Sequence, residues 1–244
     1  MRLANVPELT TNAWLRFDGI AAALARTRPN TVLEVGCGQG SLGAWLARSY
    51  RYTGVEQDDV SRAAAAARLR DVGNARIVAG LGELHGEKFD AVCAFEVLEH
   101  IEDDRKALVE WGEYLVPHGH LLLSVPAHQR RYGAWDEMVG HYRRYDRDVL
   151  QATIHEAGYD VVDFRTHGVG IGQILDRGRH AVAGRLHRDK TVEERTAASG
   201  RVLQPRSKGM FLACAALAAP FRLMQRPFAH ADIGVGYVVL ARKS

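Results

Sequence analysis

The chain has 244 residues, of which 47% are hydrophobic and 25% are charged, and its formal net charge is +3. This apolar content suffices for one sizeable core, so we expect a single domain over residues 1–244. The basic excess is too small to require nucleic acid and is compatible with a small anionic or neutral substrate, so the charge does not choose the partner.

Cysteine usage and hydropathy indicate the compartment. Cys37, Cys93 and Cys214 lie far apart without a C-x-x-C pair, which favours reduced thiols over a disulfide framework. The N-terminal stretch lacks the apolar core of a signal peptide, and the longest apolar run, 210–221, is too short to span a bilayer. We therefore expect a soluble, cytoplasmic protein, and peripheral contact with a membrane stays open.

The first part of the chain alternates between helix and strand patterns. Helical spacing of apolar residues predicts helices, and short apolar runs bounded by turn residues predict strands. In chain order we expect a helix at 12–28, a strand at 31–35, a helix at 41–50, a strand at 51–56, a helix at 59–73, strands at 75–80 and 88–95, a helix at 103–115 and a strand at 119–126. This alternation implies an α/β fold with a parallel sheet covered on both faces.

The last part of the chain is expected to add a helix and a strand within 146–168 and a final strand at 236–243. Between them, 169–234 has no clear strand signal and carries two apparent helices, at 191–203 and 208–225. We expect this stretch to form a helical cap inserted before the last strand. Its second, apolar helix could be an ordinary cap helix, line a pocket for an apolar substrate, rest on a membrane or form a homodimer interface.

The stretch VLEVGCGQGSLGAWLA joins the first strand to the next helix through a glycine-rich turn. Ligands of a parallel sheet bind beyond the carboxyl ends of its strands, where Gly36, Gly38 and Gly40 would let the backbone approach a ligand. Glu34 would repel a pyrophosphate but tolerate a ligand with an amine and a sulfonium. Glu56 follows about 20 residues later, where an acid accepts hydrogen bonds from ribose hydroxyls. The alternative is a generic nucleotide-binding sheet.

An acidic cluster with a histidine, FEVLEHIEDD, follows the fourth strand. Glu96, Glu99 and His100 are spaced i, i+3 and i+4, so a helical conformation would turn all three to one face. Groups this close would disturb one another's pKa unless a cation lies among them, and Mg²⁺, Mn²⁺ or Zn²⁺ suits such ligands. The alternative is a metal-free helix N-terminus favoured by Glu99 and Glu102.

Aromatic and basic residues interleave after the fifth strand, in HQRRYGAWDEMVGHYRRYDRDVL. Aromatic faces suit sugar rings or other flat polar ligands, and arginines suit phosphate or carboxylate. The alternative is a cation–π and salt-bridge stack that anchors the loop. The substrate wall that we expect here consists of Tyr132, Trp135, Tyr142, Arg143, Arg144 and Tyr145.

Four stretches, VLEVGCGQG, GVEQD, FDAVCAFEVLEHIEDD and LVPHGHLLLSVP, resemble successive motifs of class I S-adenosylmethionine-dependent methyltransferases, over about residues 12–165. The resemblance implies a Rossmann-like, mostly parallel seven-stranded sheet with helices on both faces, and S-adenosylmethionine as cofactor. The cofactor-binding residues that it implies are Glu34, Gly36, Cys37, Gly38, Gly40, Glu56, Gln57, Leu81, Gly82 and Phe95. The family often has an acidic residue beside the adenine, where this chain has Leu81, so adenine contacts would rest on backbone groups of Leu81 and Gly82.

The E-x-x-E-H string resembles the metal motif of ubiquinone-pathway O-methyltransferases and of small-RNA 2′-O-methyltransferases, in which a downstream histidine completes the site. This resemblance makes His141 the fourth candidate metal ligand, after Glu96, Glu99 and His100. A divalent ion would lower the pKa of an acceptor hydroxyl and orient it. Without a metal, His100 or His141 could act as the general base.

The sequence thus predicts an S-adenosylmethionine-dependent O-methyltransferase that acts on a hydroxyl of a polar small molecule, such as a sugar or oligosaccharide, with divalent-metal assistance. The second hypothesis is a quinone, polyketide or lipid-linked acceptor. An RNA 2′-O-methyltransferase would need a broader basic surface, and a non-catalytic S-adenosylmethionine-binding module would not need Glu96, Glu99 and His100. The acceptor, the methylated atom and the oligomeric state stay open.

Overall fold

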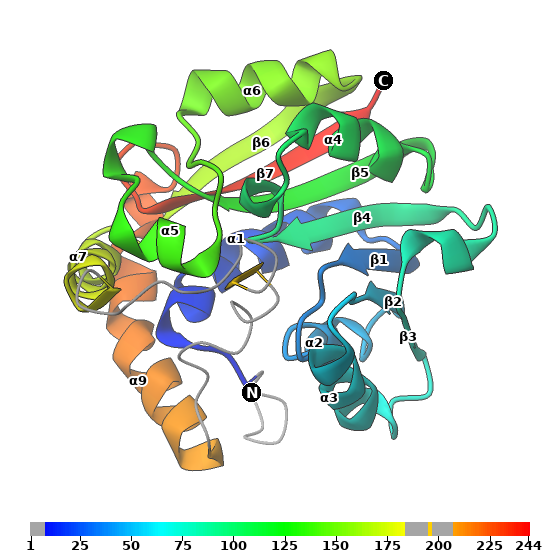
Figure 1. Cartoon of the computed structure of the whole chain (residues 1–244), viewed down its shortest axis with the longest axis horizontal. Helices are drawn as coiled ribbons and strands as arrows, with labels where there is room; N and C mark the ends of the chain where they lie inside the picture. The colour runs from blue at the N-terminus through cyan, green and yellow to red at the C-terminus, as the bar shows by residue number, and fades with distance from the viewer. Residues whose placement is uncertain (1–7, 184–194, 197–206) are drawn as a thin grey trace.

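The computed structural model of the chain describes residues 8–183, 195–196 and 207–244. Seven strands form one sheet in the order β3-β2-β1-β4-β5-β7-β6 (Figure 1). The strands are β1 (Thr31–Val35), β2 (Arg51–Val55), β3 (Ala75–Val78), β4 (Phe89–Phe95), β5 (Leu115–Pro126), β6 (Tyr159–His167) and β7 (Gly236–Lys243). Strands β1 to β5 are parallel, and β7 runs antiparallel to β5 and β6. The mostly parallel, seven-stranded sheet expected from the sequence is confirmed.

Helices cover both faces of this sheet (Figure 1). The α-helices are α1 (Thr11–Thr27), α2 (Gly43–Leu46), α3 (Asp59–Leu69), α4 (Asp104–Gly112), α5 (Ala134–Val139), α6 (Arg147–Glu156), α7 (Ile171–Ala183) and α9 (Lys208–Met224). The short 3₁₀ turns are η2 (Leu81–Leu84), η3 (Leu98–His100), η4 (Gln129–Arg131) and η5 (Arg226–Phe228).

Two apolar clusters, one on each face, hold these helices on the sheet. Helices α1, α2 and α3 contribute Ile20, Leu46 and Ala65 to one cluster, and α4 and α6 contribute Trp111 and Ile154 to the other. All five side chains are at most 2% exposed. Because burial of these apolar stripes orients the helices along the sheet, the loops at the strand ends stay free to form a site.

Side-chain caps set where three helices begin. The Thr10 hydroxyl accepts from the backbone N–H of Ala13 at the start of α1, at 3.3 Å. The Asp58 and Asp103 carboxylates accept from the third residue beyond them, at 2.9 and 3.0 Å, at the starts of α3 and α4. Such caps satisfy amide groups that the helix leaves unpaired, which explains why the starts expected from the sequence agree with the structure to within one residue.

Four elements differ from the sequence expectation, and one of them is α5, for which no helix was expected. Helix α2 covers only Gly43–Leu46 instead of 41–50, because the glycine-rich turn continues beyond residue 41 and β2 already begins at Arg51. Strand β5 begins at Leu115 rather than at 119, since Leu115 pairs with Phe89 ahead of a β-bulge. The sequence did not predict α7, in which glycines lower the helix propensity. The helix expected at 191–203 lies outside the described residues, apart from 195–196, which are helical.

Helix α9 packs one side against α1. Its Ala218 is buried in a cluster with Trp14 and Leu15 of α1. On the other side, Leu217 and Met224 are 49% and 65% exposed. Among the described helices, none combines the length and the apolar character needed to cross a membrane. Helix α9 thus packs on α1 with one side and exposes apolar residues on the other.

Candidate active site

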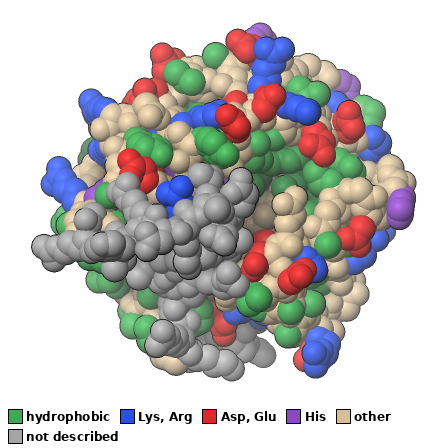
Figure 2. Space-filling view, in the orientation of Figure 1, with side chains coloured by type: hydrophobic (Ala, Val, Ile, Leu, Met, Phe, Trp, Pro, Cys, Tyr) green, Lys and Arg blue, Asp and Glu red, His purple; other side chains and the backbone are tan. Residues whose placement is uncertain are grey.

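A cavity of about 990 Å³ opens at the carboxyl ends of the parallel strands, where ligands of such sheets bind. Its glycine-loop half is lined by residues within 34–42, 55–58 and 81–82, and its histidine half by residues within 95–101, 135–144 and 167–179. Figure 2 shows a hollow on this face, with hydrophobic and acidic side chains around it. The volume lies in the range of sites for small molecules and cofactors.

The glycines of the first loop are required by its geometry. Gly36, Gly38 and Gly40 have φ angles of +69°, +54° and +72°, a region that other residues rarely adopt. A Cβ atom on Gly36 would lie 2.6 Å from a methyl group of Val97, and one on Gly40 would lie 3.1 Å from Ala65. Gly36 and Gly38 line the cavity, whereas Gly40 lets α3 pack closely against the loop.

Glu56 lies in the cavity at the end of β2 and is held by the backbone. Its two carboxylate oxygens accept hydrogen bonds from the N–H groups of Gly38 and Asp58, at 2.8 and 2.9 Å. Each oxygen keeps a further lone pair, so the carboxylate can also accept from the hydroxyls of a ribose. Its place matches the one that the sequence predicts.

Glu34 lies beneath the glycine loop and is 4% exposed. The Tyr52 hydroxyl donates a hydrogen bond of 2.5 Å to its carboxylate. Burial raises the pKa of Glu34 to about 7, although the Tyr52 hydrogen bond and the positive charge of Arg16 lower it in part. Glu34 is therefore poised between its neutral and charged forms near neutral pH.

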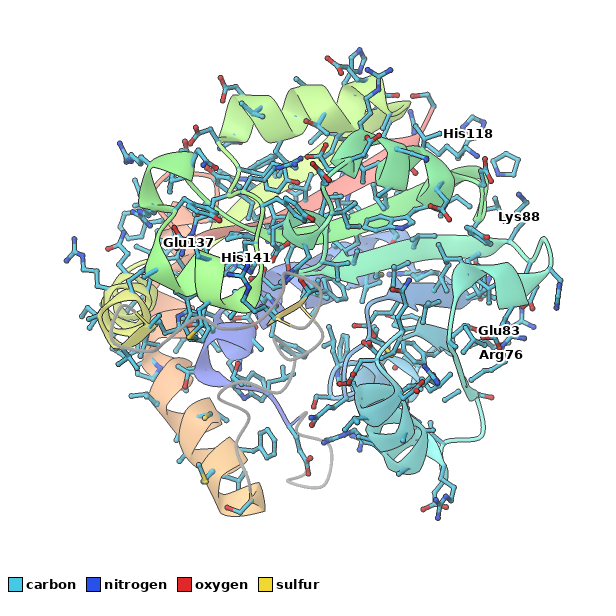
Figure 3. All side chains as sticks on the ribbon, viewed as in Figure 1. Arg76, Glu83, Lys88, His118, Glu137 and His141 are labelled. Atoms are coloured by element: carbon cyan, nitrogen blue, oxygen red, sulfur yellow. The ribbon has the colours of Figure 1, made fainter. Side chains whose placement is uncertain are left out.

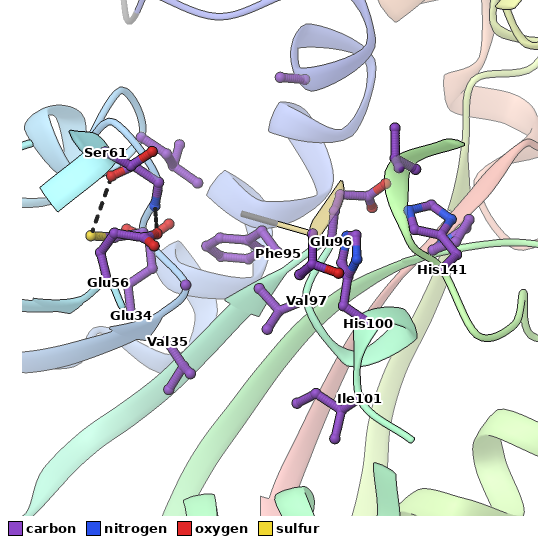
Figure 4. Close-up of a pocket in the computed structure, with 18 of the residues that line it drawn as sticks. Glu34, Val35, Glu56, Ser61, Phe95, Glu96, Val97, His100, Ile101 and His141 are labelled. Carbon is purple, nitrogen blue, oxygen red and sulfur yellow. Dashed lines mark hydrogen bonds between the residues drawn. The ribbon is translucent and has the colours of Figure 1, made fainter. Parts of the chain in front are cut away.

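The other residues predicted for the cofactor also meet here. Cys37, Gln57, Leu81, Gly82 and Phe95 all line the cavity. The close-up in Figure 4 shows Glu34 and Glu56 at one end of the pocket and His100 and His141 at the other, with Phe95 between them.

Arg16 of α1 is a cavity residue that the sequence analysis missed. Its guanidinium lies 3.7 Å from the Glu96 carboxylate, and its charge also acts on Glu34. Arginines on an amphipathic helix are common, so no local pattern distinguishes this one. Only the position of α1 against the sheet brings it to the strand ends.

Three potential metal ligands converge in the histidine half. One ligand atom each of Glu99, His100 and His141 lie within 4.8 Å of one another. The two imidazole rings meet edge to face with centroids 4.6 Å apart, and His141 Nε2 lies 3.7 Å from Glu99 Oε1. His141 follows α5 near the centre of the molecule, far from the surface histidine His118 (Figure 3). The structure thus brings together residues that lie about 40 positions apart in the sequence.

Glu96 is not a member of this trio, although its charge acts on Glu99 and His100. A helical segment would turn Glu96, Glu99 and His100 to one face, but in this segment Leu98–His100 form a 3₁₀ turn that does not include Glu96. Glu96 precedes that turn with a φ angle of +58°. Its carboxylate accepts a hydrogen bond from the Ser124 hydroxyl at 3.0 Å and lies beside Arg16.

Burial shifts the pKa values of Glu99 and His100. Glu99 is completely buried, and neither of its carboxylate oxygens has a hydrogen-bond partner among the described residues. Burial raises the pKa of Glu99 well above its ordinary value, and the negative charge of Glu96 raises it further. Burial, together with His141, lowers the pKa of His100 to about 4. At neutral pH the site thus contains a neutral His100 and a carboxyl group without a partner.

Hydrogen bonds fix the orientation of both imidazoles. His100 Nδ1 lies 3.2 Å from the carbonyl oxygen of Gly140, and His141 Nδ1 lies 2.8 Å from Asp136 Oδ1. A carbonyl or a carboxylate oxygen accepts here, so each neutral ring carries its proton on Nδ1. The Nε2 atoms keep their lone pairs, which is the usual form of metal-binding histidines. The donor set therefore fits a divalent cation.

The predicted substrate wall divides into two groups. Trp135, Tyr142 and Arg144 line the cavity. The other three bind inside the protein: the Tyr132 hydroxyl donates to the carbonyl of His141 at 2.7 Å, and Arg143 and Tyr145 both bind Asp104.

Arg144 lines the cavity but is only 4% exposed, and its guanidinium forms ion pairs with Asp136 and Asp176 inside the protein. Of the two aromatic lining residues, Tyr142 is 41% exposed, and the Arg179 guanidinium lies over the Trp135 ring, 5.1 Å from its centroid. Arg179 and Asp176 of α7 line the same half and were not found by the sequence analysis, because no motif marks them.

The order of the strands, with an antiparallel β7 between β5 and β6, and the glycine-loop cavity at their carboxyl ends define a class I methyltransferase fold. The chain belongs to the methyltransferase-domain family, whose model matches residues 13–163.

Curated relatives carry related names. An uncharacterised methyltransferase of Mycobacterium tuberculosis is 34% identical over 128 residues, which are 51% of this chain and 65% of that protein. A ubiquinone biosynthesis O-methyltransferase of Alkalilimnicola ehrlichii is 34% identical over 119 residues, which are 45% of this chain and 47% of that protein. The chain thus spans less than two thirds of the length of either relative.

Solved structures share the fold over nearly the whole chain. An S-adenosylmethionine-dependent methyltransferase of Mesorhizobium loti superposes with a TM-score of 0.60 at 15% identity, covering 94% of this chain and 98% of that chain. The [4+2]-cyclase SpnF superposes with a TM-score of 0.57 at 22% identity, covering 93% of this chain and 80% of that chain. Since one of these proteins is titled a cyclase, the fold does not by itself define the reaction.

The raised pKa of Glu34 leads to a pH-dependent affinity for the cofactor. A ligand with a sulfonium and an amine favours the ionised carboxylate, so its affinity should increase as the pH rises through about 7. Full coupling would make binding up to about tenfold tighter at pH ~8 than at pH ~6. Calorimetric titration with S-adenosylmethionine measures this, and Glu34→Gln should flatten the profile. An equal pH dependence in the variant would assign the effect to other groups.

Proposed function

We propose that this protein transfers a methyl group from S-adenosylmethionine to a hydroxyl oxygen of a small acceptor, and that Glu99, His100 and His141 hold a divalent cation for this reaction. The observation that carries the proposal is Glu99, a fully buried carboxyl group that has no side-chain hydrogen-bond partner among the described residues and lies beside two oriented imidazoles. A buried polar group needs a partner, and a divalent cation bound by the ionised carboxylate would supply one. Glu96 is outside the proposed ligand set, because its carboxylate accepts the Ser124 hydrogen bond and it does not belong to the converging group of Glu99, His100 and His141.

The bound groups would supply the chemistry, and the chain would position them. S-adenosylmethionine supplies an electrophilic methyl group, and a divalent cation lowers the pKa of a hydroxyl that it binds. Gly36, Gly38 and Glu56 would hold the nucleoside part. Arg16 would pair with the carboxylate of the methionine part, because its guanidinium lies between the two halves of the cavity with only a loose ion pair to Glu96.

Proton removal by a histidine alone is the less favoured mechanism. A general base works best when its pKa lies near the operating pH. His100, with a pKa lowered to about 4, would be a weak base at neutral pH. His141 would remain as the base of a metal-free mechanism. The low pKa suits a metal ligand, because such ligands must be deprotonated.

A phenolic acceptor fits the histidine half better than a sugar does. The arginines that suggested a sugar or an anionic ligand are bound to Asp104, Asp136 and Asp176. The aromatic and apolar part of this lining consists of Val97, Ile101, Trp135, Val139, Tyr142 and Val235, and charged residues such as Lys106, Glu110 and Arg179 also line the cavity. Such a surface packs against a flat ring, and the Alkalilimnicola ehrlichii relative is a ubiquinone biosynthesis O-methyltransferase.

Chelation tests the metal in this proposal. Label transfer from methyl-labelled S-adenosylmethionine to a panel of catechols, simple sugars and matched amines should favour the catechols. Exhaustive chelation should abolish the transfer, because without the cation the pKa of the acceptor hydroxyl is no longer lowered. Adding back Mg²⁺, Mn²⁺ or Zn²⁺ should restore the transfer. Transfer that survives chelation would leave His141 as the base. Equal labelling of amines and hydroxyls would overturn O-methylation.

The small net charge of +3 does not favour a nucleic-acid acceptor. A homodimer, or a peripheral membrane contact, through the exposed side of α9 stays a prediction. No residue of α9 is among the residues that line the described cavity, so that helix is not proposed as part of the acceptor pocket.

A further inference from the structure

Asp136 links the proposed active site to the inserted helix α7. It lies in α5, its side chain is completely buried, and it is not among the residues that line the cavity. Its Oδ1 atom accepts hydrogen bonds from His141 Nδ1 and from Arg144 Nε, both at 2.8 Å. Its Oδ2 atom accepts from the backbone N–H of Gly133 at 3.0 Å. Its backbone carbonyl accepts from the N–H of His141 at 2.9 Å, so two separate bonds connect it to this histidine.

A second ion pair continues the connection. The Arg144 guanidinium donates two hydrogen bonds, of 3.2 and 3.0 Å, to the carboxylate of Asp176 in α7. Arg144 and Asp176 are 4% and 5% exposed. His180, one turn farther along α7, lies 2.9 Å from Arg144 and 3.6 Å from Asp136. Buried groups of this kind hold a single geometry, because breaking any one contact leaves another charge without a partner.

We propose that Asp136 is a positioning residue for His141, and that Arg144 and Asp176 fix it in place from the inserted helix α7. The inference rests on the proposed function, in which His141 Nε2 is a ligand atom. A carboxylate that accepts the Nδ1 proton selects one tautomer and one ring orientation, and both are needed to turn the Nε2 lone pair toward Glu99. In this arrangement, helix α7 supplies Asp176, the outer member of a series of contacts that runs through Arg144 and Asp136 to His141.

A structural role alone is the competing explanation, since Asp136 and Arg144 could merely anchor a loop. The two explanations differ in what happens to His141 when the protein stays folded. Asp136→Asn keeps the shape of the side chain but offers an amide in place of a carboxylate, so the preference for the Nδ1–H tautomer should weaken. Asp104→Asn is the matched control, because it removes a carboxylate from the neighbouring Arg143 and Tyr145 without touching His141.

The experiment measures ring nitrogen shifts and Mn²⁺ affinity in the full-length protein. In the metal-free wild type, ¹⁵N NMR of histidine side chains should show His141 with its proton on Nδ1, and a His141→Gln spectrum assigns the signal. Asp136→Asn should give a mixture of tautomers and weaken Mn²⁺ binding by about 10- to 100-fold. The EPR signal of free Mn²⁺ measures this binding. Asp176→Asn should produce a smaller change in the same direction, and it keeps the test usable if Asp136→Asn does not fold.

The outcomes separate the inference from the proposed function. If Asp136→Asn and Asp176→Asn lower the melting temperature but leave the His141 tautomer and the Mn²⁺ affinity as in Asp104→Asn, the positioning role is overturned. If the wild type binds no Mn²⁺, the metal in the proposed function fails, while the tautomer shift still decides whether Asp136 positions His141.

Discussion

Glu99→Gln should reduce methyl transfer by about 10²- to 10⁴-fold, the range that activation of a nucleophile contributes. The substitution keeps the side-chain volume and removes the only carboxylate of the three-residue ligand set. Rates of label transfer and Mn²⁺ affinity, measured on the same preparation, test this expectation. Glu102→Gln is the matched control, since Glu102 is exposed on the following loop.

The same variant should not lose stability in its metal-free form. A buried carboxyl group without hydrogen bonds is costly to ionise, so a neutral amide of the same shape should leave the free energy of unfolding unchanged or raise it. Opposite effects on activity and stability would distinguish a functional carboxylate from a structural one. Retention of more than about half of the wild-type rate would contradict the proposed role of Glu99.

Gly36→Ala should abolish cofactor binding or weaken it by at least about 100-fold. A Cβ atom there would lie 2.6 Å from Val97 Cγ2, and a φ angle of +69° costs a residue other than glycine about 1–2 kcal/mol. The loop must therefore move, and with it the backbone that approaches the nucleoside. Calorimetric titration with S-adenosylmethionine measures the loss.

A second substitution separates the clash from the strain. Gly36→Ala combined with Val97→Ala removes the Val97 methyl group and should recover part of the affinity, whereas the backbone strain persists. Gly73→Ala is the control for a glycine replacement with open space around it, and it should bind the cofactor like the wild type. If the double variant binds no better than Gly36→Ala, the contact with Val97 is not the cause.

Much of the fold could be predicted from the sequence, because strands and helices differ in the period of their apolar residues. The strands at 31–35 and 88–95 and the helix at 12–28 have patterns that local burial alone explains. Helix α7 could not be predicted in this way. Its glycine Gly172 lies against Leu15 of α1, so a tertiary contact rather than propensity stabilises it.

The candidate site was predictable where a single loop carries it. Gly36 and Gly38 need positive φ angles, and Glu56 directly follows β2, so local sequence suffices to place them at the strand ends. The pair Glu99 and His100 lies within one turn, and the motif alone identified it. Glu96 is not part of this turn, because it follows β4 with a positive φ angle, and the motif does not reveal that backbone conformation.

By itself the sequence determined the sheet, the glycine loop and the Glu99–His100 motif, because each depends on neighbours along the chain. Only the tertiary structure decided what surrounds them. It turned Arg144 inward to Asp136 and Asp176, and brought Arg16 into the cavity. The physical reason is that buried ion pairs form between whichever charged groups folding places together, and their partners lie on elements that the local pattern cannot connect.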